Sequence, residues 1–184
     1  VLRSVMRVGC LTSFHHFRLG VFRIYRETLS RFSCAASPTI SQAIKKLTIL
    51  KPELRFVLAV HPNPTVKQAV MDNLSDVENL SIVEPLDYLA LQQTLASSVL
   101  TMTDSGGIQE EAPTYGTPVV ILRETTERPE ALNLGLSILA GADDSNRIVD
   151  AALTLLSQGK SEDCVNPYGK GDASALICKR VQEF

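Results

Sequence analysis

Residues 101–111 of the chain read TMTDSGGIQEE, and this stretch decides the fold. Its first residues are apolar or β-branched and predict a strand, which runs into two adjacent glycines. Helical spacing then runs from Ile108 to Tyr115, with Gly116 placed as the C-terminal cap. A strand, a glycine turn and a helix in this order are typical of a βαβ unit.

The same alternation of strands and helices continues on both sides of this stretch. Short apolar runs predict strands at residues 56–60, 80–83, 99–102, 118–122 and 136–139. Apolar residues at helical spacing predict further helices near residues 40–47, 66–74, 88–96, 148–156 and 172–181. The last helix follows a turn at residues 166–171, and Asp172 is its candidate N-cap. The pattern therefore predicts an α/β domain with a mainly parallel sheet.

The loop at residues 104–107 follows its strand at the carboxyl end, where ligands bind in parallel sheets. Gly106 and Gly107 let the backbone approach a ligand closely, because neither carries a Cβ. The first N–H groups of the next helix lack partners within it, so together with the helix dipole they favour an anion such as a diphosphate. Ser105 adds a hydroxyl donor. A Gly-Gly turn by itself is equally compatible with a tight turn that binds nothing.

Two carboxylates, Glu110 and Glu111, follow this loop. Acidic residues in the first turns of a helix complement its dipole. Both carboxylates would nevertheless repel a diphosphate, so at least one of them must face something else. Glu111 lies four residues after Gly107 and shares its helix face. We expect the Glu111 carboxylate to accept hydrogen bonds from two ribose hydroxyls there.

Arg128 and His61 follow other predicted strands at the same edge of the sheet. The planar guanidinium of an arginine matches a phosphate with two donors, and Pro129 can open a short helix after it. Taken alone, however, residues 123–130 are better explained as a solvated loop of mixed charge. A lone histidine such as His61 is likewise more often structural than a ligand.

Composition restricts the possible partners and the compartment. The formal net charge is -2, no apolar run approaches the length of a membrane span, and the chain has no Trp and only 5% aromatic residues. We therefore expect no nucleic acid and no membrane as partners. The four cysteines form no C-x-x-C pair and the histidines complete no metal pattern, which favours a reducing compartment and no metal site. They are Cys10, Cys34, Cys164 and Cys178.

Taken together, several runs resemble the non-hydrolysing UDP-N-acetylglucosamine 2-epimerases over about residues 39–184. The runs are, in order, HPNP at 61–64, DSGGIQEEAP at 104–113, GTPV at 116–119, RETTERPE at 123–130 and NPYG at 166–169. The resemblance implies a Rossmann-like three-layer domain, which is one half of a glycosyltransferase-B-like fold. It also implies a cytoplasmic isomerase that interconverts UDP-GlcNAc and UDP-ManNAc with no cofactor, and a homodimer for the full-length protein.

The same resemblance assigns roles to particular residues. Ser105, Gly106 and Gly107 correspond to residues that hold the diphosphate, Glu111 to one that binds the ribose, and Arg128 to one that adds charge near the phosphates. His61 resembles a histidine that bacterial members use at an allosteric UDP-GlcNAc site. The catalytic residues are unknown here, because the acid and base carboxylates of the family belong to an N-terminal half that these 184 residues do not match.

Residues 1–38 depart from the family and are treated as a divergent or mis-encoded segment, separate from the domain at 39–184. This segment is rich in Arg and nearly free of acidic residues, which is also typical of a transit peptide. The pairs Thr12-Ser13 and Leu19-Gly20 fit a family loop whose core is replaced here, so we favour a truncated or altered start. No catalytic role is assigned to His15 or His16.

Three functions remain in competition at this point. The first is the UDP-sugar-binding domain of an epimerase that is incomplete, and therefore inactive, as an isolated chain. The second is a non-catalytic regulatory module that binds a UDP-sugar. The third is a glycosyltransferase of the same fold, which the run ETTERP at residues 124–129 makes less favoured.

Overall fold

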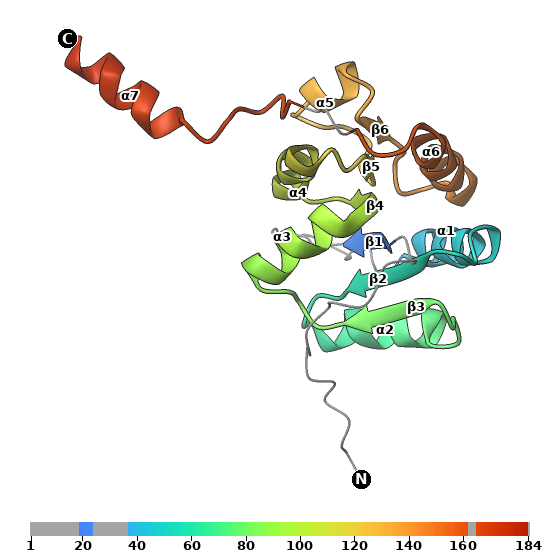
Figure 1. Cartoon of the computed structure of the whole chain (residues 1–184). Coiled ribbons are helices and arrows are strands. Elements are labelled where there is room, and N and C mark those ends of the chain that lie inside the picture. The colour runs from blue at the N-terminus through green and yellow to red at the C-terminus, as the bar shows by residue number, and fades with distance from the viewer. Residues whose placement is uncertain (1–18, 24–36, 162–164, 184) are drawn as a thin grey trace.

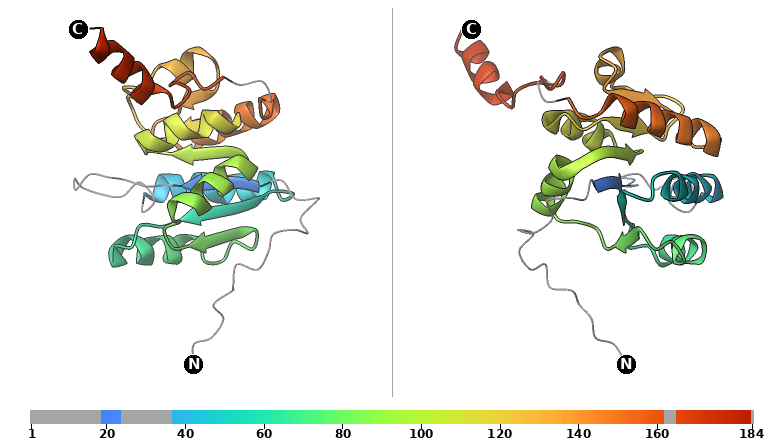
Figure 2. Two further views of the ribbon diagram at one scale, coloured as in Figure 1. Left: turned by 60° about the vertical axis from the view of Figure 1, so that its left-hand side comes forward. Right: turned by 45° about the vertical axis from the view of Figure 1, so that its right-hand side comes forward.

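The computed structural model describes residues 19–23, 37–161 and 165–183, shown from three directions in Figures 1 and 2. The described residues form a six-stranded sheet, in which each neighbouring pair is parallel and the order is β3-β2-β1-β4-β5-β6. The strands are β1 (Leu19–Arg23), β2 (Arg55–Ala59), β3 (Leu80–Val83), β4 (Ser98–Thr103), β5 (Val119–Ile121) and β6 (Ser137–Leu139).

Helices alternate with the strands along the chain, which confirms the α/β prediction. They are α1 (Pro38–Leu50), α2 (Pro64–Leu74), α3 (Tyr88–Ser97), α4 (Gly106–Glu111), the 3-10 helix η2 (Ala112–Tyr115), α5 (Glu130–Asn133), α6 (Ser145–Gln158) and α7 (Ala173–Gln182). In Figure 1, α1, α2 and α6 lie on one side of the sheet and α3 and α4 on the other. The domain is therefore three-layered and Rossmann-like, as expected.

Two hydrophobic cores separate these layers, because successive side chains of a strand point to opposite faces. In β5, Val120 packs into the core formed with α1, α2 and α6, whereas Val119 and Ile121 pack against α3 and α4. All three residues are at most 1% exposed. A strand that is buried on both faces reads as a continuous apolar run, which is why this strand was predictable from the sequence.

Strand β1 is an element that sequence analysis does not predict. It lies in the middle of the sheet, where Leu19 to Arg23 pair with β2 on one side and with β4 on the other. The strand is only five residues long and contains Gly20, so it carries neither a strong strand signal nor a helical period. It also lies within 1–38, so part of that segment belongs to the sheet, and the boundary at residue 38 stays a prediction.

The remaining predictions for the N-terminal segment concern residues that lie outside the described part of the chain. These are the residues Thr12, Ser13, His15 and His16.

The helix after the glycine loop differs in detail from the prediction. It begins at Gly106 rather than at Ile108, and after Glu111 it tightens into the 3-10 helix η2. Pro113 explains the change, because proline has no N–H to continue the α-helical hydrogen bonds. Gly116 ends η2 with φ +63, as expected for a left-handed C-terminal cap.

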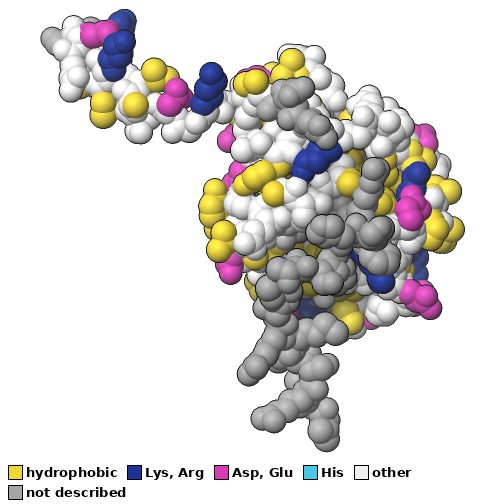
Figure 3. All heavy atoms as spheres, viewed as in Figure 1, with side chains coloured by type: hydrophobic (Ala, Val, Ile, Leu, Met, Phe, Trp, Pro, Cys, Tyr) yellow, Lys and Arg dark blue, Asp and Glu magenta, His cyan; other side chains and the backbone are white. Residues whose placement is uncertain are grey.

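Helix α7 projects from the body of the domain (Figures 1 and 2). It forms where the helical spacing predicts a helix, and Asp172 stands at its N-cap position but makes no side-chain capping bond. None of its residues is buried. Figure 3 shows hydrophobic side chains, coloured yellow, on this projecting helix, and the exposed ones include Leu176, Ile177 and Val181.

Two properties of the described residues bear on partners. No helix within 19–23, 37–161 or 165–183 is both long and apolar enough to cross a membrane. Across the same ranges no three His, Cys, Asp or Glu side chains are grouped so that they would hold a metal ion.

Gly116 should be the least replaceable glycine of the domain. A Cβ at this position would overlap the carbonyl oxygen of Ser161, and φ is +63. We expect Gly116→Ala to lower the free energy of unfolding by about 2–4 kcal/mol, measured by urea denaturation.

Gly135→Ala is the matched control, because φ there is +70 but no atom of the described residues lies within 4 Å of the added Cβ. It should cost only about 1–2 kcal/mol, the strain of the left-handed conformation. Equal losses for the two variants would contradict the close contact with Ser161.

Candidate functional site

The loop between β4 and α4 is fixed by the strand that precedes it. Thr103, the last residue of β4, is fully buried, and its Oγ1 accepts a hydrogen bond of 3.0 Å from the backbone N–H of Ser105. The carbonyl oxygen of Ser105 in turn accepts from the N–H of Gln109 at 3.3 Å, the first bond of the helix. The loop therefore leaves the sheet in one defined direction, at the carboxyl end of a central strand.

The tip of α4 presents a group of hydrogen-bond donors. Among the described residues, the backbone N–H groups of Gly106, Gly107 and Ile108 have no hydrogen-bond partner. The hydroxyl of Ser105 makes no capping bond to the helix either, although Ser105 is the N-cap residue. These donors, together with the positive end of the helix dipole, form the kind of surface that binds phosphate oxygens.

Arg128 lies directly over this tip. A Cβ built on Gly106 would stand 2.6 Å from Cζ of the guanidinium, so no other residue fits beneath Arg128 without displacing it. The close approach places the full positive charge of the arginine beside the free amides of α4. The loops after β4 and β5 are thus brought together, as their positions at one edge of a parallel sheet predict.

Two carboxylates hold Arg128 in this position. Nε of Arg128 donates to Glu110 and Nη1 donates to Glu127, and the side chain of Arg128 is 24% exposed. Its pKa is raised, mainly by the hydrogen bond to Glu110 and further by attraction to Glu110 and Glu127. The pKa of Glu127 is lowered, because its carboxylate accepts from its own backbone N–H and is attracted by Arg123 and Arg128.

The segment that carries Arg128 is tied to α4 by polar contacts. Oγ1 of Thr126 donates to Oε1 of Gln109 at 2.7 Å and accepts from the N–H of Arg128 at 3.2 Å. Gln109 is 1% exposed, so this bond lies inside the domain. The charge pattern of residues 123–130 favours a solvated loop. The hydrogen bonds of Thr126 and Arg128 instead make the second half of this segment part of the packed domain.

The run at residues 166–169 also holds the two loops together. Nδ2 of Asn166 donates to the carbonyl oxygen of Glu110 at 2.9 Å and to Oγ1 of Thr114 at 2.7 Å. The hydroxyl of Tyr168 donates to the carbonyl oxygen of Arg128 at 3.1 Å and accepts from the N–H of Ala131 at 3.3 Å. Burial raises the pKa of Tyr168. Sequence reasoning treats this run as a simple turn, and only its place in the family resemblance signals a role.

Glu111 faces the same tip from the other side. One carboxylate oxygen, Oε2, accepts a hydrogen bond of 2.7 Å from Nε2 of Gln92 on α3. The other oxygen, Oε1, lies 3.9 Å from a Cβ built on Gly107, as does Oγ of Ser105. The Ser105 hydroxyl and the Glu111 carboxylate therefore both lie beside Gly107. Sequence reasoning does not find Gln92.

His61 is not brought to this cluster. It follows β2, and β1 separates β2 from β4 in the sheet. Its Nδ1 accepts a hydrogen bond of 3.2 Å from the N–H of Asn63, which caps α2 by accepting from the N–H of Thr65 at 2.9 Å. Of the six residues singled out from the sequence, the structure brings together Ser105, Gly106, Gly107, Glu111 and Arg128, and places His61 elsewhere on the same edge.

Comparison with known proteins identifies relatives over most of the chain. A family model described as UDP-N-acetylglucosamine 2-epimerase matches residues 16–182. The UDP-N-acetylglucosamine 2-epimerase of Neisseria meningitidis is 40% identical over 146 residues, which is 77% of this chain and 39% of that protein. The chain thus spans about two fifths of the length of this relative.

Solved structures agree with the sequence matches. The epimerase of Neisseria meningitidis bound to UDP-GlcNAc superposes with a TM-score of 0.78 at 32% identity, covering 91% of this chain and 45% of that one. The UDP-GlcNAc 2-epimerase of Methanocaldococcus jannaschii, in complex with UDP-GlcNAc and UDP, gives a TM-score of 0.75 at 25% identity over 92% of this chain and 46% of that one.

Removing the Tyr168 hydroxyl should loosen the Arg128 loop. Tyr168→Phe loses the bonds to the backbone of Arg128 and Ala131, and we expect the free energy of unfolding to fall by about 1–2 kcal/mol. Amide hydrogen exchange at Ala131 should also become faster.

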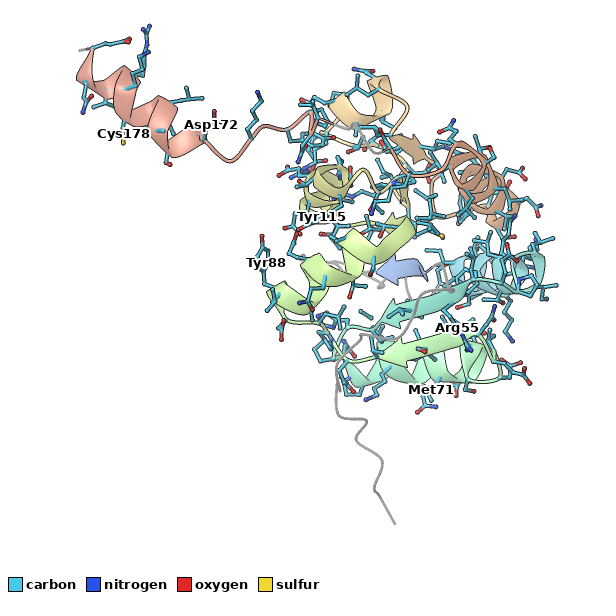
Figure 4. The ribbon with its side chains drawn as sticks, in the orientation of Figure 1. Arg55, Met71, Tyr88, Tyr115, Asp172 and Cys178 are labelled. Atoms are coloured by element: carbon cyan, nitrogen blue, oxygen red, sulfur yellow. The ribbon has the colours of Figure 1, made fainter. Side chains whose placement is uncertain are left out.

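Tyr88→Phe serves as the control, because Tyr88 is 71% exposed and points away from the body in Figure 4. It should change neither measurement. Unchanged exchange at Ala131 in Tyr168→Phe would contradict the role of the hydroxyl.

Proposed function

The chain belongs to the UDP-N-acetylglucosamine 2-epimerase family, and from this premise we propose that residues 39–184, together with strand β1, form the UDP-sugar-binding domain of such an enzyme. The observation that carries the proposal is the set of donors around Gly106. Three free amides, the hydroxyl of Ser105 and the guanidinium of Arg128 lie around Gly106 and Gly107, just after the carboxyl end of β4.

A diphosphate matches this set of groups. Its oxygens accept from the amides of Gly106, Gly107 and Ile108, and its charge is neutralised by Arg128 and by the dipole of α4. Glu110 and Glu127 already pair with Arg128, so the ligand has to compete with two carboxylates for the guanidinium. The hydroxyl of Ser105 lies beside Gly107 and adds a donor for a phosphate oxygen.

Glu111 gives the site its preference for a nucleoside. Its Oε1 faces Gly107, next to the position proposed for the diphosphate. A ribose attached to that diphosphate presents two adjacent hydroxyls, and a carboxylate accepts hydrogen bonds from both. The repulsion between Glu111 and the phosphates is thereby avoided, because a neutral sugar lies between them.

The reaction proposed for the full-length protein is the interconversion of UDP-GlcNAc and UDP-ManNAc without an added redox cofactor. UDP is eliminated to leave a glycal and is then added back with C2 inverted. This domain holds the leaving UDP, which retains it for the return step. The acid and base that act on the sugar belong to the other half of the fold, and we propose that the full-length protein is a cytoplasmic homodimer.

His61 is proposed as part of a separate regulatory site for UDP-GlcNAc. Its support is the family resemblance of residues 61–64 and its position at the carboxyl edge of the sheet, on the far side of β1 from the diphosphate site.

Titration calorimetry with UDP tests the binding site. Arg128→Ala should weaken binding about 10- to 100-fold, because a hydrogen-bonded charge pair with phosphate is lost. Ser105→Ala should weaken it about three- to tenfold.

Arg147→Ala is the matched control, since Arg147 is exposed on α6, on the opposite side of the sheet from α4. It should bind UDP like the wild type. If the double variant Ser105→Ala/Arg128→Ala also keeps wild-type affinity, the proposed site is wrong.

Catalysis by the 184-residue chain alone is a further test. We expect no conversion of UDP-GlcNAc in a coupled assay, even when UDP binds, because half of the cleft positions the nucleotide but supplies no acid–base pair over C2. Clear turnover by this chain would show that it carries catalytic groups of its own.

A further inference from the structure

Glu111 is the end of a hydrogen-bonded chain that crosses from η2 to α3 and back to α4. The hydroxyl of Tyr115 donates to Oε1 of Gln92 at 2.8 Å, and Nε2 of Gln92 donates to Oε2 of Glu111 at 2.7 Å. All three side chains are partly buried in these contacts. Figure 4 shows Tyr115 between α4 and α3, where it can reach the latter helix.

The chain has only one orientation in which both bonds are satisfied. A side-chain amide has a donor end and an acceptor end, whereas an ionised carboxylate only accepts. If the amide of Gln92 were turned over, its oxygen would face the carboxylate of Glu111, and two acceptors would repel each other. The Glu111 carboxylate therefore fixes which end of Gln92 faces it, and the Tyr115 hydroxyl donates to the amide oxygen at the other end.

The helices that carry these residues are themselves held together. Leu91 and Leu95 of α3 pack against Ile108 and Ala112 in the smaller core. Oγ1 of the buried Thr117 also donates to the carbonyl oxygen of Leu95 at 2.8 Å. Gln92 and Tyr115 thus stand on one packed unit, so their bond is held by the fold rather than by two flexible side chains.

We propose that Tyr115 and Gln92 are positioning residues that hold the Glu111 carboxylate toward the ribose, and this inference rests on the proposed function. With Oε2 bonded to Gln92, the other oxygen is directed at Gly107 and Ser105, where the nucleotide is expected. A carboxylate that is already oriented loses less side-chain freedom when a ligand binds. The two residues therefore strengthen recognition of the ribose without touching it.

Calorimetry with UDP and 2′-deoxy-UDP on the full chain tests the proposal. The wild type should bind UDP about tenfold more tightly, because the deoxy ligand lacks one hydroxyl that Glu111 accepts from. Gln92→Leu keeps the size of the side chain but removes the amide, and should weaken UDP about three- to tenfold. It should weaken 2′-deoxy-UDP by a smaller factor, because that ligand keeps only one of the two hydroxyls that Glu111 accepts from. The preference for UDP over the deoxy ligand then shrinks, which loss of packing alone would not produce.

Tyr115→Phe provides a second variant that keeps the ring and its packing. It should reduce the preference about two- to fivefold, and the double variant should be no worse than Gln92→Leu, because both changes act through one chain of bonds. Gln93→Leu is the matched control, since Gln93 is exposed on the same helix, and it should behave like the wild type.

The outcomes separate this inference from the proposed function. Suppose that the wild type prefers UDP over 2′-deoxy-UDP and that this preference is lost in Glu111→Ala but retained in both Gln92→Leu and Tyr115→Phe. That result overturns the inference and keeps the proposed function. A preference that survives Glu111→Ala also overturns the inference, because Glu111 then does not read the ribose, whereas a wild type that binds neither ligand overturns both.

Discussion

The guanidinium of Arg128 rests on Gly106, and this contact sets the geometry of the whole functional edge. A side chain at position 106 would displace the guanidinium, and the contact brings together the loops after β4 and β5. The parallel pairing of these two strands supplies the convergence, because their carboxyl ends lie side by side. A buried scaffold thereby places a positive charge next to free amides that no secondary structure uses.

Ion pairs with two carboxylates hold the Arg128 guanidinium in place. Glu110 and Glu127 pair with Arg128 from two sides, while Asn166 and Tyr168 bind the backbone on which Glu110 and Arg128 stand. Partial burial of an unpaired cation destabilises the fold, so the two carboxylates stabilise Arg128 in its position. The same carboxylates would compete with a bound anion for the guanidinium. The position of the Arg128 guanidinium is therefore fixed by ion pairs to its side chain and by hydrogen bonds to the backbone of its loop and of α4.

The sequence predicts the parts of this arrangement that depend on local pattern. Buried strands such as β4 and β5 read as apolar runs, and Ser105, Gly106 and Gly107 mark the turn between strand and helix. Gln92 and Tyr115 are different, because they meet Glu111 only when α3 packs against η2, a contact between segments about twenty residues apart.

Two elements show the limits of local pattern from opposite directions. The sequence of β1 gives almost no strand signal, yet the strand lies in the middle of the sheet. Its backbone pairs with β2 on one side and with β4 on the other, and this pairing stabilises a strand that its own five residues do not predict. Helix α7 has a clear helical period, and the helix forms, but none of its residues is buried. Spacing predicts the type of an element, and the neighbours decide whether it is buried.

The central position of β1 has a consequence for folding and handling of the protein. Within the sheet, β1 alone connects the pair β2–β3 to the group β4–β5–β6. Without it, two half-sheets would each present an open edge of unpaired amides and carbonyls, and such edges recruit strands from other molecules. By pairing on both sides, the five residues from Leu19 to Arg23 close these two edges, although they lie far in sequence from the cluster around Gly106.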